Sequence, residues 1–163
     1  MSIKREAAFH EAGHAIVAYR SRFHNVIAGI NLERHGAGEI FISLSKKKLA
    51  AAGKSLELAA LLDPEVAIDL AVILCAGLVA ERIAEERDDS LKADSTCAVP
   101  DHRLMEQQLE AAGLPKKFDT HEDVAKALLI SEWALVDALA ERLFKRISVD
   151  AVEIREFIEN WGR

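Results

Sequence analysis

Residues 3–23 read IKREAAFHEAGHAIVAYRSRF. The stretch has no proline, and its apolar side chains recur at three- and four-residue intervals, which predicts a helix that ends near residues 23–25. Ser2 is in position to cap its start. Inside it lies His10-Glu11-Ala12-Gly13-His14, a His-Glu-x-x-His pattern. Gly13 costs a helix about 1 kcal/mol relative to alanine, which indicates that another element or a ligand approaches closely there.

The pattern suits metal-assisted hydrolysis. Side chains four residues apart lie on one face of a helix, one turn apart. His10 and His14 can therefore bind one metal ion, and Glu11 can reach a water bound to that ion. Two neutral histidine ligands, an open coordination position and a carboxylate base are the features of a zinc hydrolase.

Composition and charge limit the class of protein. The chain has 163 residues, half of them hydrophobic, which predicts a single domain spanning 1–163. The net charge of −6 argues against a nucleic-acid partner. The two cysteines show no Cys-x-x-Cys spacing, and no signal peptide is recognised, so we expect a cytoplasmic protein.

The remaining patterns predict an α+β fold, mainly helical with a small β-hairpin. Residues 26–32 and 39–44 are strand-like runs that flank a glycine-containing loop. The basic run 46–48 is expected to be a solvated loop. Residues 66–80 are strongly apolar but contain Asp69 and fall short of the ~20 residues that a membrane span needs, so we expect a buried helix. The predicted helices are 56–62, 63–86 with a cap at Asp63, 100–113, 120–146 with a cap at Thr120, and one that starts at a capping box, Asp150 to Glu153.

The pattern supplies two ligands, whereas a catalytic zinc usually has three from the protein. The metzincin spacing requires His at 20 and Gly at 17, but the chain has arginine and valine there. His24 and His35 are expected at the surface. Asp94, Asp101 and His102, which follow the apolar helix, remain as candidates. A carboxylate in the first turn of a helix is oriented and easily kept ionised, which favours Asp101.

Four segments resemble the peptidase domain of the FtsH-type AAA zinc metalloproteases. They are AFHEAGHA (8–15), AGLVAE (76–81), TCAVPD (96–101) and the late helix 125–143. Their order and spacing agree with that family, and so does the place of the hairpin at 26–44. The resemblance implies a zincin-like metallopeptidase domain in which His10, His14 and Asp101 hold Zn²⁺.

The resemblance also implies an activity. Glu11 would assist attack of a zinc-bound water on peptide bonds of flexible or unfolded polypeptides, and then pass the proton to the leaving amine. The family carries a glutamate at the place of Glu81. Here it would accept a hydrogen bond from a ligand histidine, or it is a solvated acid at a helix end. No second oxyanion donor is recognised in the sequence.

Partners and alternatives stay open at this point. Because the motif begins at residue 10, we expect neither a membrane anchor nor an ATPase module before it. AGKS (52–55) lacks the upstream glycine of a phosphate-binding loop, so activity is expected to be ATP-independent. A separate ATPase or self-association would be compatible with this. Leu78 and Cys97 replace the family's Arg and Gly, which leaves two alternatives: a peptide- or partner-binding module without turnover, and a zinc hydrolase of a non-peptide bond.

Overall fold

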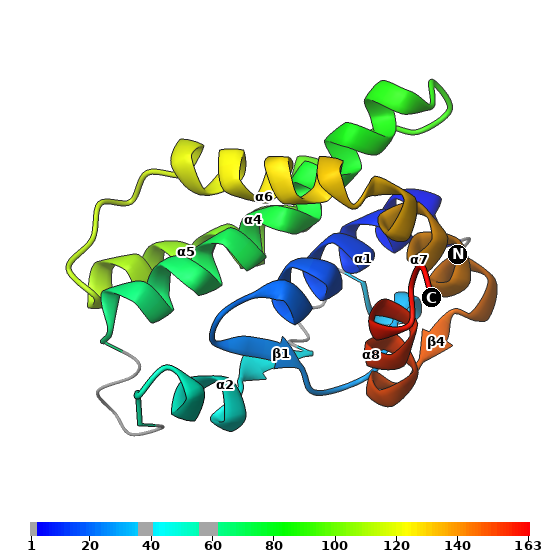
Figure 1. Ribbon diagram of the computed structural model, residues 1–163. Helices are drawn as coiled ribbons and strands as arrows, with labels where there is room; N and C mark the ends of the chain where they lie inside the picture. Colours follow the sequence, from blue (N-terminus) through cyan, green and yellow to red (C-terminus); the bar gives the residue numbers. More distant parts are fainter. Residues whose placement is uncertain (1–2, 36–40, 56–61) are drawn as a thin grey trace.

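The computed structural model describes residues 3–35, 41–55 and 62–163. It is mainly helical with a small antiparallel β part, as predicted (Figure 1). Ser2 and nearly all of the helix expected at 56–62 lie outside the described residues. The described helices are α1 Arg5–Arg20, α2 Lys46–Ala51, α4 Pro64–Arg87, α5 Val99–Ala111, α6 Asp119–Ser131, α7 Trp133–Arg146 and α8 Ala151–Glu159, with the 3₁₀ turns η1 Leu32–Arg34 and η2 Ser95–Ala98.

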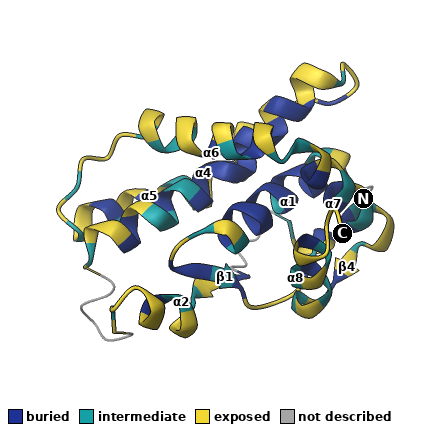
Figure 2. Cartoon of the chain, in the orientation of Figure 1, coloured by how far each residue is buried: buried dark blue, intermediate teal, exposed yellow. Residues whose placement is uncertain are grey.

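Helix α4 is the centre of the fold. It begins as predicted, because the Asp63 carboxylate accepts the backbone N–H groups of Glu65 and Val66 while Pro64 occupies the first turn. Helices α1, α5 and α6 pack around it, and its middle is buried (Figure 2). The prediction of a buried helix at 66–80 is therefore confirmed. Within the described ranges, none of the helices has the length and apolar character to cross a membrane.

Small residues let α1 and α4 approach closely. A Cβ atom on Gly13 would lie 2.7 Å from the carbonyl oxygen of Ala76 and 2.7 Å from the Cβ of Ala80. The sequence predicted that another element or a ligand approaches Gly13 closely, and α4 is that element. This contact also places the motif face of α1 directly against α4.

The end of α1 differs from the prediction. The helix ends at Arg20 rather than near 23–25, and the hydroxyl of Ser21 donates to the carbonyl oxygen of Ala18. The basic run 46–48 is not a solvated loop, because it forms the start of α2. The ammonium of Lys48 donates to carbonyl oxygens of Ala18, Tyr19 and His24. The last carbonyls of a helix lack intrahelical partners and carry partial negative charge, so they attract a cation.

The hairpin prediction is partly confirmed. Strand β1 (His24–Val26) pairs antiparallel with β3 (Ile42–Leu44). The segment 30–31 does not belong to that hairpin: as β2 (Ile30–Asn31) it pairs with β4 (Ser148–Val149), close to the C-terminal helix. Gly29 permits this turn away from β1, because a Cβ there would lie 2.9 Å from the carbonyl oxygen of Val149.

The predicted helix 120–146 is two helices. The break is at Glu132 (φ −114°, ψ 26°), and Thr120 lies inside α6 rather than capping it. The break redirects the chain: α6 packs on α4, whereas α7 packs on α1. The Arg20 guanidinium donates to both carboxylate oxygens of Glu132 at 2.8–3.1 Å, which holds the break against α1.

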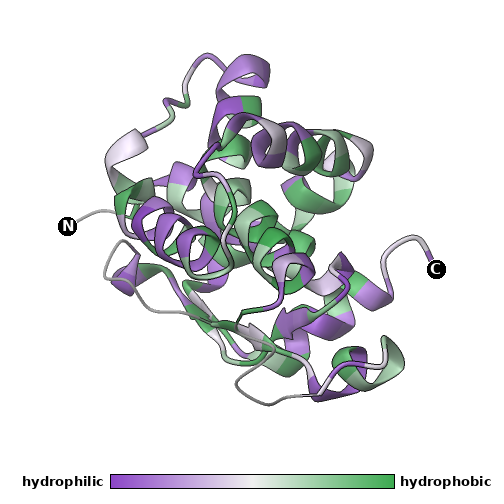
Figure 3. Cartoon of the chain, turned by 90° about the vertical axis from the view of Figure 1, so that its left-hand side faces the viewer, coloured by the Kyte–Doolittle hydropathy of each residue, from purple (hydrophilic) through white to green (hydrophobic). Residues whose placement is uncertain are grey.

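The C-terminal helix completes the core. Helix α8 begins where the Asp150 carboxylate accepts the backbone N–H of Glu153, as the capping box predicts. Val149 and Ile154, on either side of this cap, are both buried. The outer helices carry polar and apolar residues on different faces, as amphipathic helices do (Figure 3).

Candidate metal centre

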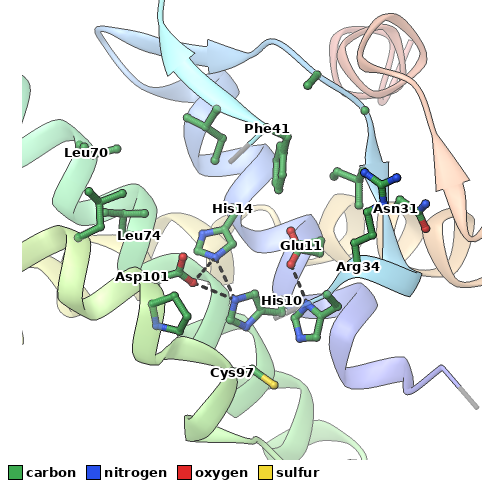
Figure 4. A pocket seen from close by; sticks show the side chains of 17 residues that line it. His10, Glu11, His14, Asn31, Arg34, Phe41, Leu70, Leu74, Cys97 and Asp101 are labelled. Carbon is green, nitrogen blue, oxygen red and sulfur yellow. Dashed lines mark hydrogen bonds and ion pairs between the residues drawn. The ribbon is translucent and has the colours of Figure 1, made fainter. Parts of the chain in front are cut away.

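Three metal-ligating side chains meet at the contact of α1, α4 and α5. His10 Nε2 lies 3.0 Å from His14 Nε2, and Asp101 Oδ2 lies 3.2 Å and 3.0 Å from those two atoms (Figure 4). Both histidines are buried, and Asp101 stands in the first turn of α5. No other such group of three is present in the part of the chain that the structure describes.

The hydrogen bond made by Nδ1 of each ring determines whether its Nε2 faces the other ring with a proton or with a lone pair. His14 Nδ1 lies 2.7 Å from the carbonyl oxygen of Ile73, which only accepts, so this nitrogen carries the proton. His10 Nδ1 lies 2.6 Å from Glu81 Oε2 and donates to that carboxylate. In their neutral forms both histidines therefore direct an Nε2 lone pair at the other and at a carboxylate oxygen. Three acceptors that converge in this way require a cation or protons between them.

The charges around this cluster favour a cation. Burial lowers the pKa of His10, but hydrogen bonds to Asp101 and Glu81 and the charge of Glu11 outweigh it and raise that pKa to about 10. Burial raises the pKa of Asp101, yet when protons rather than a metal ion lie between the three groups, the charge on the protonated rings and their hydrogen bonds to Asp101 hold that pKa well below its ordinary value. The spacing is also suitable, since ligand atoms on a tetrahedral zinc lie roughly 3.3 Å apart.

The other candidates for third ligand lie elsewhere. The Asp94 carboxylate accepts the backbone N–H and the hydroxyl of Thr96, and so it caps η2. The His102 ring packs against Phe118, with ring centroids 5.1 Å apart. The structure thus brings Asp101, and neither Asp94 nor His102, to the two histidines.

Glu81 is a buried partner of the cluster. It is 1% exposed, which excludes the alternative of a solvated acid at a helix end. One carboxylate oxygen accepts from His10 Nδ1, and the other accepts the backbone N–H of Asp94 at 3.2 Å. It therefore links α1 to the segment that leads into α5 and to Asp101.

If His10, His14 and Asp101 hold zinc, as the sequence predicts, Glu81→Gln should weaken its binding about 10- to 100-fold, because partners of this kind orient a ligand histidine and raise its basicity. Competition against a zinc-binding dye would measure the dissociation constant. Glu85→Gln, on the exposed side of the same helix one turn later, is the matched control. Equal affinities in the two variants would show that Glu81 does not support the site.

Only the three-dimensional structure shows why residue 77, in helix α4, is a glycine. A Cβ atom there would lie 2.5 Å from Nε2 of both His10 and His14. The two rings therefore rest on bare backbone of α4. The sequence shows a glycine in an apolar helix, but nothing local says which side chains occupy the space above it.

His35 is a second residue whose place the sequence did not reveal. It was expected at the surface, but its side chain is 13% exposed and its Nδ1 lies 2.8 Å from Glu11 Oε1. Its ring meets the edge of the His10 ring, with centroids 4.9 Å apart. No local pattern could have found this contact, because 24 residues and a turn separate the partners.

The surroundings of Glu11 keep its carboxyl group ionised. Burial raises its pKa, but the hydrogen bond from His35 and the positive charges of His14 and His10 outweigh burial and lower that pKa below 4.5. The carboxyl group is therefore ionised at neutral pH.

His24, the other histidine expected at the surface, is also buried, but it pairs with Asp69 at 2.6 Å, away from the cluster.

The cluster opens into a pocket of about 340 Å³. Leu70 and Leu74 lie on one side of it, and Asn31 and Arg34 lie on the other side, beyond Glu11 (Figure 4). Residues 28–31 and Cys97 also line it. The pocket thus combines an apolar wall, a strand segment and an ionised carboxylate beside three metal-ligating atoms.

Comparison with known protein families and with curated proteins gives no match for this chain. The chain combines a mainly helical fold with a cluster of two buried histidines and a partly buried Asp101 beside an ionised glutamate.

Proposed function

We propose that this chain is a zinc-dependent metallopeptidase with a zincin-like fold similar to the FtsH-type peptidase domain. One observation carries the proposal: the lone pairs of His10 Nε2, His14 Nε2 and Asp101 Oδ2 converge within 3.2 Å, and the ionised Glu11 lies in the same pocket. The segments that resemble that family support it further, since three of the four supply the residues that meet here.

The ligand set fits zinc. Two imidazoles and one carboxylate, with room in a pocket for a further ligand, are typical of catalytic rather than closed structural sites. When bound, zinc would lower the pKa of a coordinated water to about 7 and polarise the carbonyl group of a substrate. Glu81 and the carbonyl group of Ile73 keep the two rings in the tautomer that binds metal.

The chain's own residues handle the proton. Glu11 takes a proton from the attacking water and then donates it to the leaving amine, so one carboxylate acts as base and as acid. Because Oε1 accepts from His35, Oε2 is assigned this role. The apolar wall beside Asp101 lowers the local dielectric constant, which strengthens the interaction of these charges with the reacting group.

An extended segment favours a polypeptide as the substrate. Leu32 N donates to the carbonyl oxygen of Ile147 in register with the β2–β4 pair. Alternate residues of an antiparallel strand direct their backbone groups to opposite sides, so those of Asn31 point away from β4. Asn31 lines the pocket, and its backbone N–H suits a hydrogen bond to an extended peptide, whereas its carbonyl group accepts the first bond of η1. The cytoplasmic location and a separate ATPase partner stay predictions.

The test combines metal content and proteolysis. We expect the wild type to purify with stoichiometric zinc and to cleave unfolded casein, with loss of activity on chelation and recovery on addition of zinc. Asp101→Ala removes one of three ligands, so it should lose stoichiometric zinc and activity together. Asp94→Ala and His102→Ala change the two other candidate ligands and should keep their zinc.

The outcomes separate the alternatives. A wild type without stoichiometric zinc would refute the metal site itself. Zinc binding without cleavage of any unfolded protein would favour a binding module or a hydrolase of another bond. Loss of zinc in Asp94→Ala or His102→Ala, with retention in Asp101→Ala, would assign the third ligand differently.

A further inference from the structure

We propose that His35 is a positioning residue that holds the general base Glu11 in its working orientation through the Nδ1–H···Oε1 hydrogen bond. This inference rests on the proposed function, and it concerns a residue that the resemblance to FtsH-type peptidases does not include. The hydrogen bond is 2.8 Å long, and the two side chains are 13% and 14% exposed.

The backbone around His35 is fixed by several contacts. Turn η1 begins where the Asn31 side chain accepts the backbone N–H of Glu33, and His35 N donates to the carbonyl oxygen of Leu32. Leu32 in turn donates to Ile147, which precedes β4. The imidazole therefore approaches Glu11 from an element tied to the C-terminal part of the chain, not from a free loop end.

The ring is also fixed from the side. It meets the edge of the His10 ring at an interplanar angle of 77°, with centroids 4.9 Å apart. His10 is held by Glu81, so the contacts run from Glu81 through His10 to His35 and Glu11. This arrangement leaves the His35 ring little freedom to turn its Nδ1 away from the carboxylate.

The hydrogen bond from His35 restricts the rotation of the Glu11 side chain. A glutamate side chain has three rotatable bonds, and a general base must present one oxygen to the proton that it takes. A donor on Oε1 restricts the carboxylate and leaves Oε2 for the proton. The donor is Nδ1–H whether the ring is neutral or protonated, because a carboxylate accepts only. The role therefore does not depend on the ionisation of His35.

Two substitutions test this role. His35→Leu removes the donor and keeps a similar volume, whereas His35→Asn keeps an N–H donor near the place of Nδ1. Both variants should retain stoichiometric zinc, because His35 is not a ligand. With labelled casein, we expect kcat of His35→Leu to fall about 10- to 100-fold with little change in KM. His35→Asn should recover most of the lost rate.

A second measurement does not need activity. In protein labelled with ¹⁵N-histidine, the slowly exchanging Nδ1–H signal of His35 should persist in Glu11→Gln, which still offers an acceptor, and disappear in Glu11→Ala. Equal kcat in wild type and His35→Leu, or equal losses in the two His35 variants, would overturn the positioning role. A wild type that binds zinc and cleaves nothing would refute the proposed function instead, and the NMR signal would then report separately whether the hydrogen bond forms.

Discussion

Glu11→Gln is expected to lower the rate of peptide hydrolysis about 10²- to 10⁴-fold while zinc binding is retained. An amide cannot take a proton from water at neutral pH, and general acid–base catalysis contributes about 10²- to 10⁴-fold to a rate. Glutamine has nearly the shape of glutamate, and its carbonyl oxygen can accept the hydrogen bond from His35 that Glu11 Oε1 accepts. The proposed ligands His10, His14 and Asp101 are untouched. The substitution thus removes the base and little else.

The measurement pairs metal content with the rate of casein cleavage for wild type and Glu11→Gln. Retained zinc with a rate lowered by about two to four orders of magnitude would assign Glu11 the role of base. Glu33→Gln, on an exposed side chain of η1, is a suitable charge control and should cleave like the wild type. A Glu11→Gln variant with wild-type activity would show that the proton goes elsewhere and would contradict the proposed mechanism.

Gly77→Ala is expected to eliminate the metal site by the addition of a single methyl group. The new Cβ would lie 2.5 Å from Nε2 of both His10 and His14, well inside van der Waals contact. Neither ring can turn away freely, because His10 is hydrogen-bonded to Glu81 and His14 is hydrogen-bonded to the carbonyl group of Ile73. Overpacking of this kind costs about 1–3 kcal/mol. Here the strain falls on the two atoms that would bind zinc.

An alanine in an unobstructed helix stabilises by roughly 0.5–1 kcal/mol relative to glycine, so the sign of the effect is informative. We expect Gly77→Ala to bind no stoichiometric zinc and to unfold at lower denaturant concentration than the wild type. Glu86→Ala, exposed on the same helix, should match the wild type in zinc content. Increased stability together with normal zinc content would mean that the rings do not lie over Gly77.

Local signals in the chain were sufficient for several elements. Asp63 with Pro64, and Asp150 with Glu153, predict helix starts that the structure contains, because a cap acts on N–H groups two or three residues away. The approach at Gly13 was also predictable, since a glycine inside a helix needs a reason. Each of these inferences uses partners within one or two turns of the chain.

Other features depend on distant partners, and the predictions there were wrong. The break at Glu132 follows from two helices that pack on different neighbours, and the residues around it favour one continuous helix. The run at 46–48 looks like a solvated loop until the carbonyl groups at the end of α1 are placed beside Lys48. Strand β2 pairs with residues more than a hundred positions later in the chain.

The sequence by itself determined the helix that carries His10, Glu11 and His14, because helical periodicity alone places the two histidines on one face. It also limited the candidates for a third metal ligand to Asp94, Asp101 and His102. Only the tertiary structure decided that Asp101 meets the two histidines. The same holds for the hydrogen bond that orients the His10 ring on Glu81 and for the space that Gly77 leaves for both rings. It holds as well for the contact of His35 with Glu11. The physical reason is that these contacts join side chains 24 to 91 positions apart, whose meeting depends on how α1, α4 and α5 pack and not on any local preference.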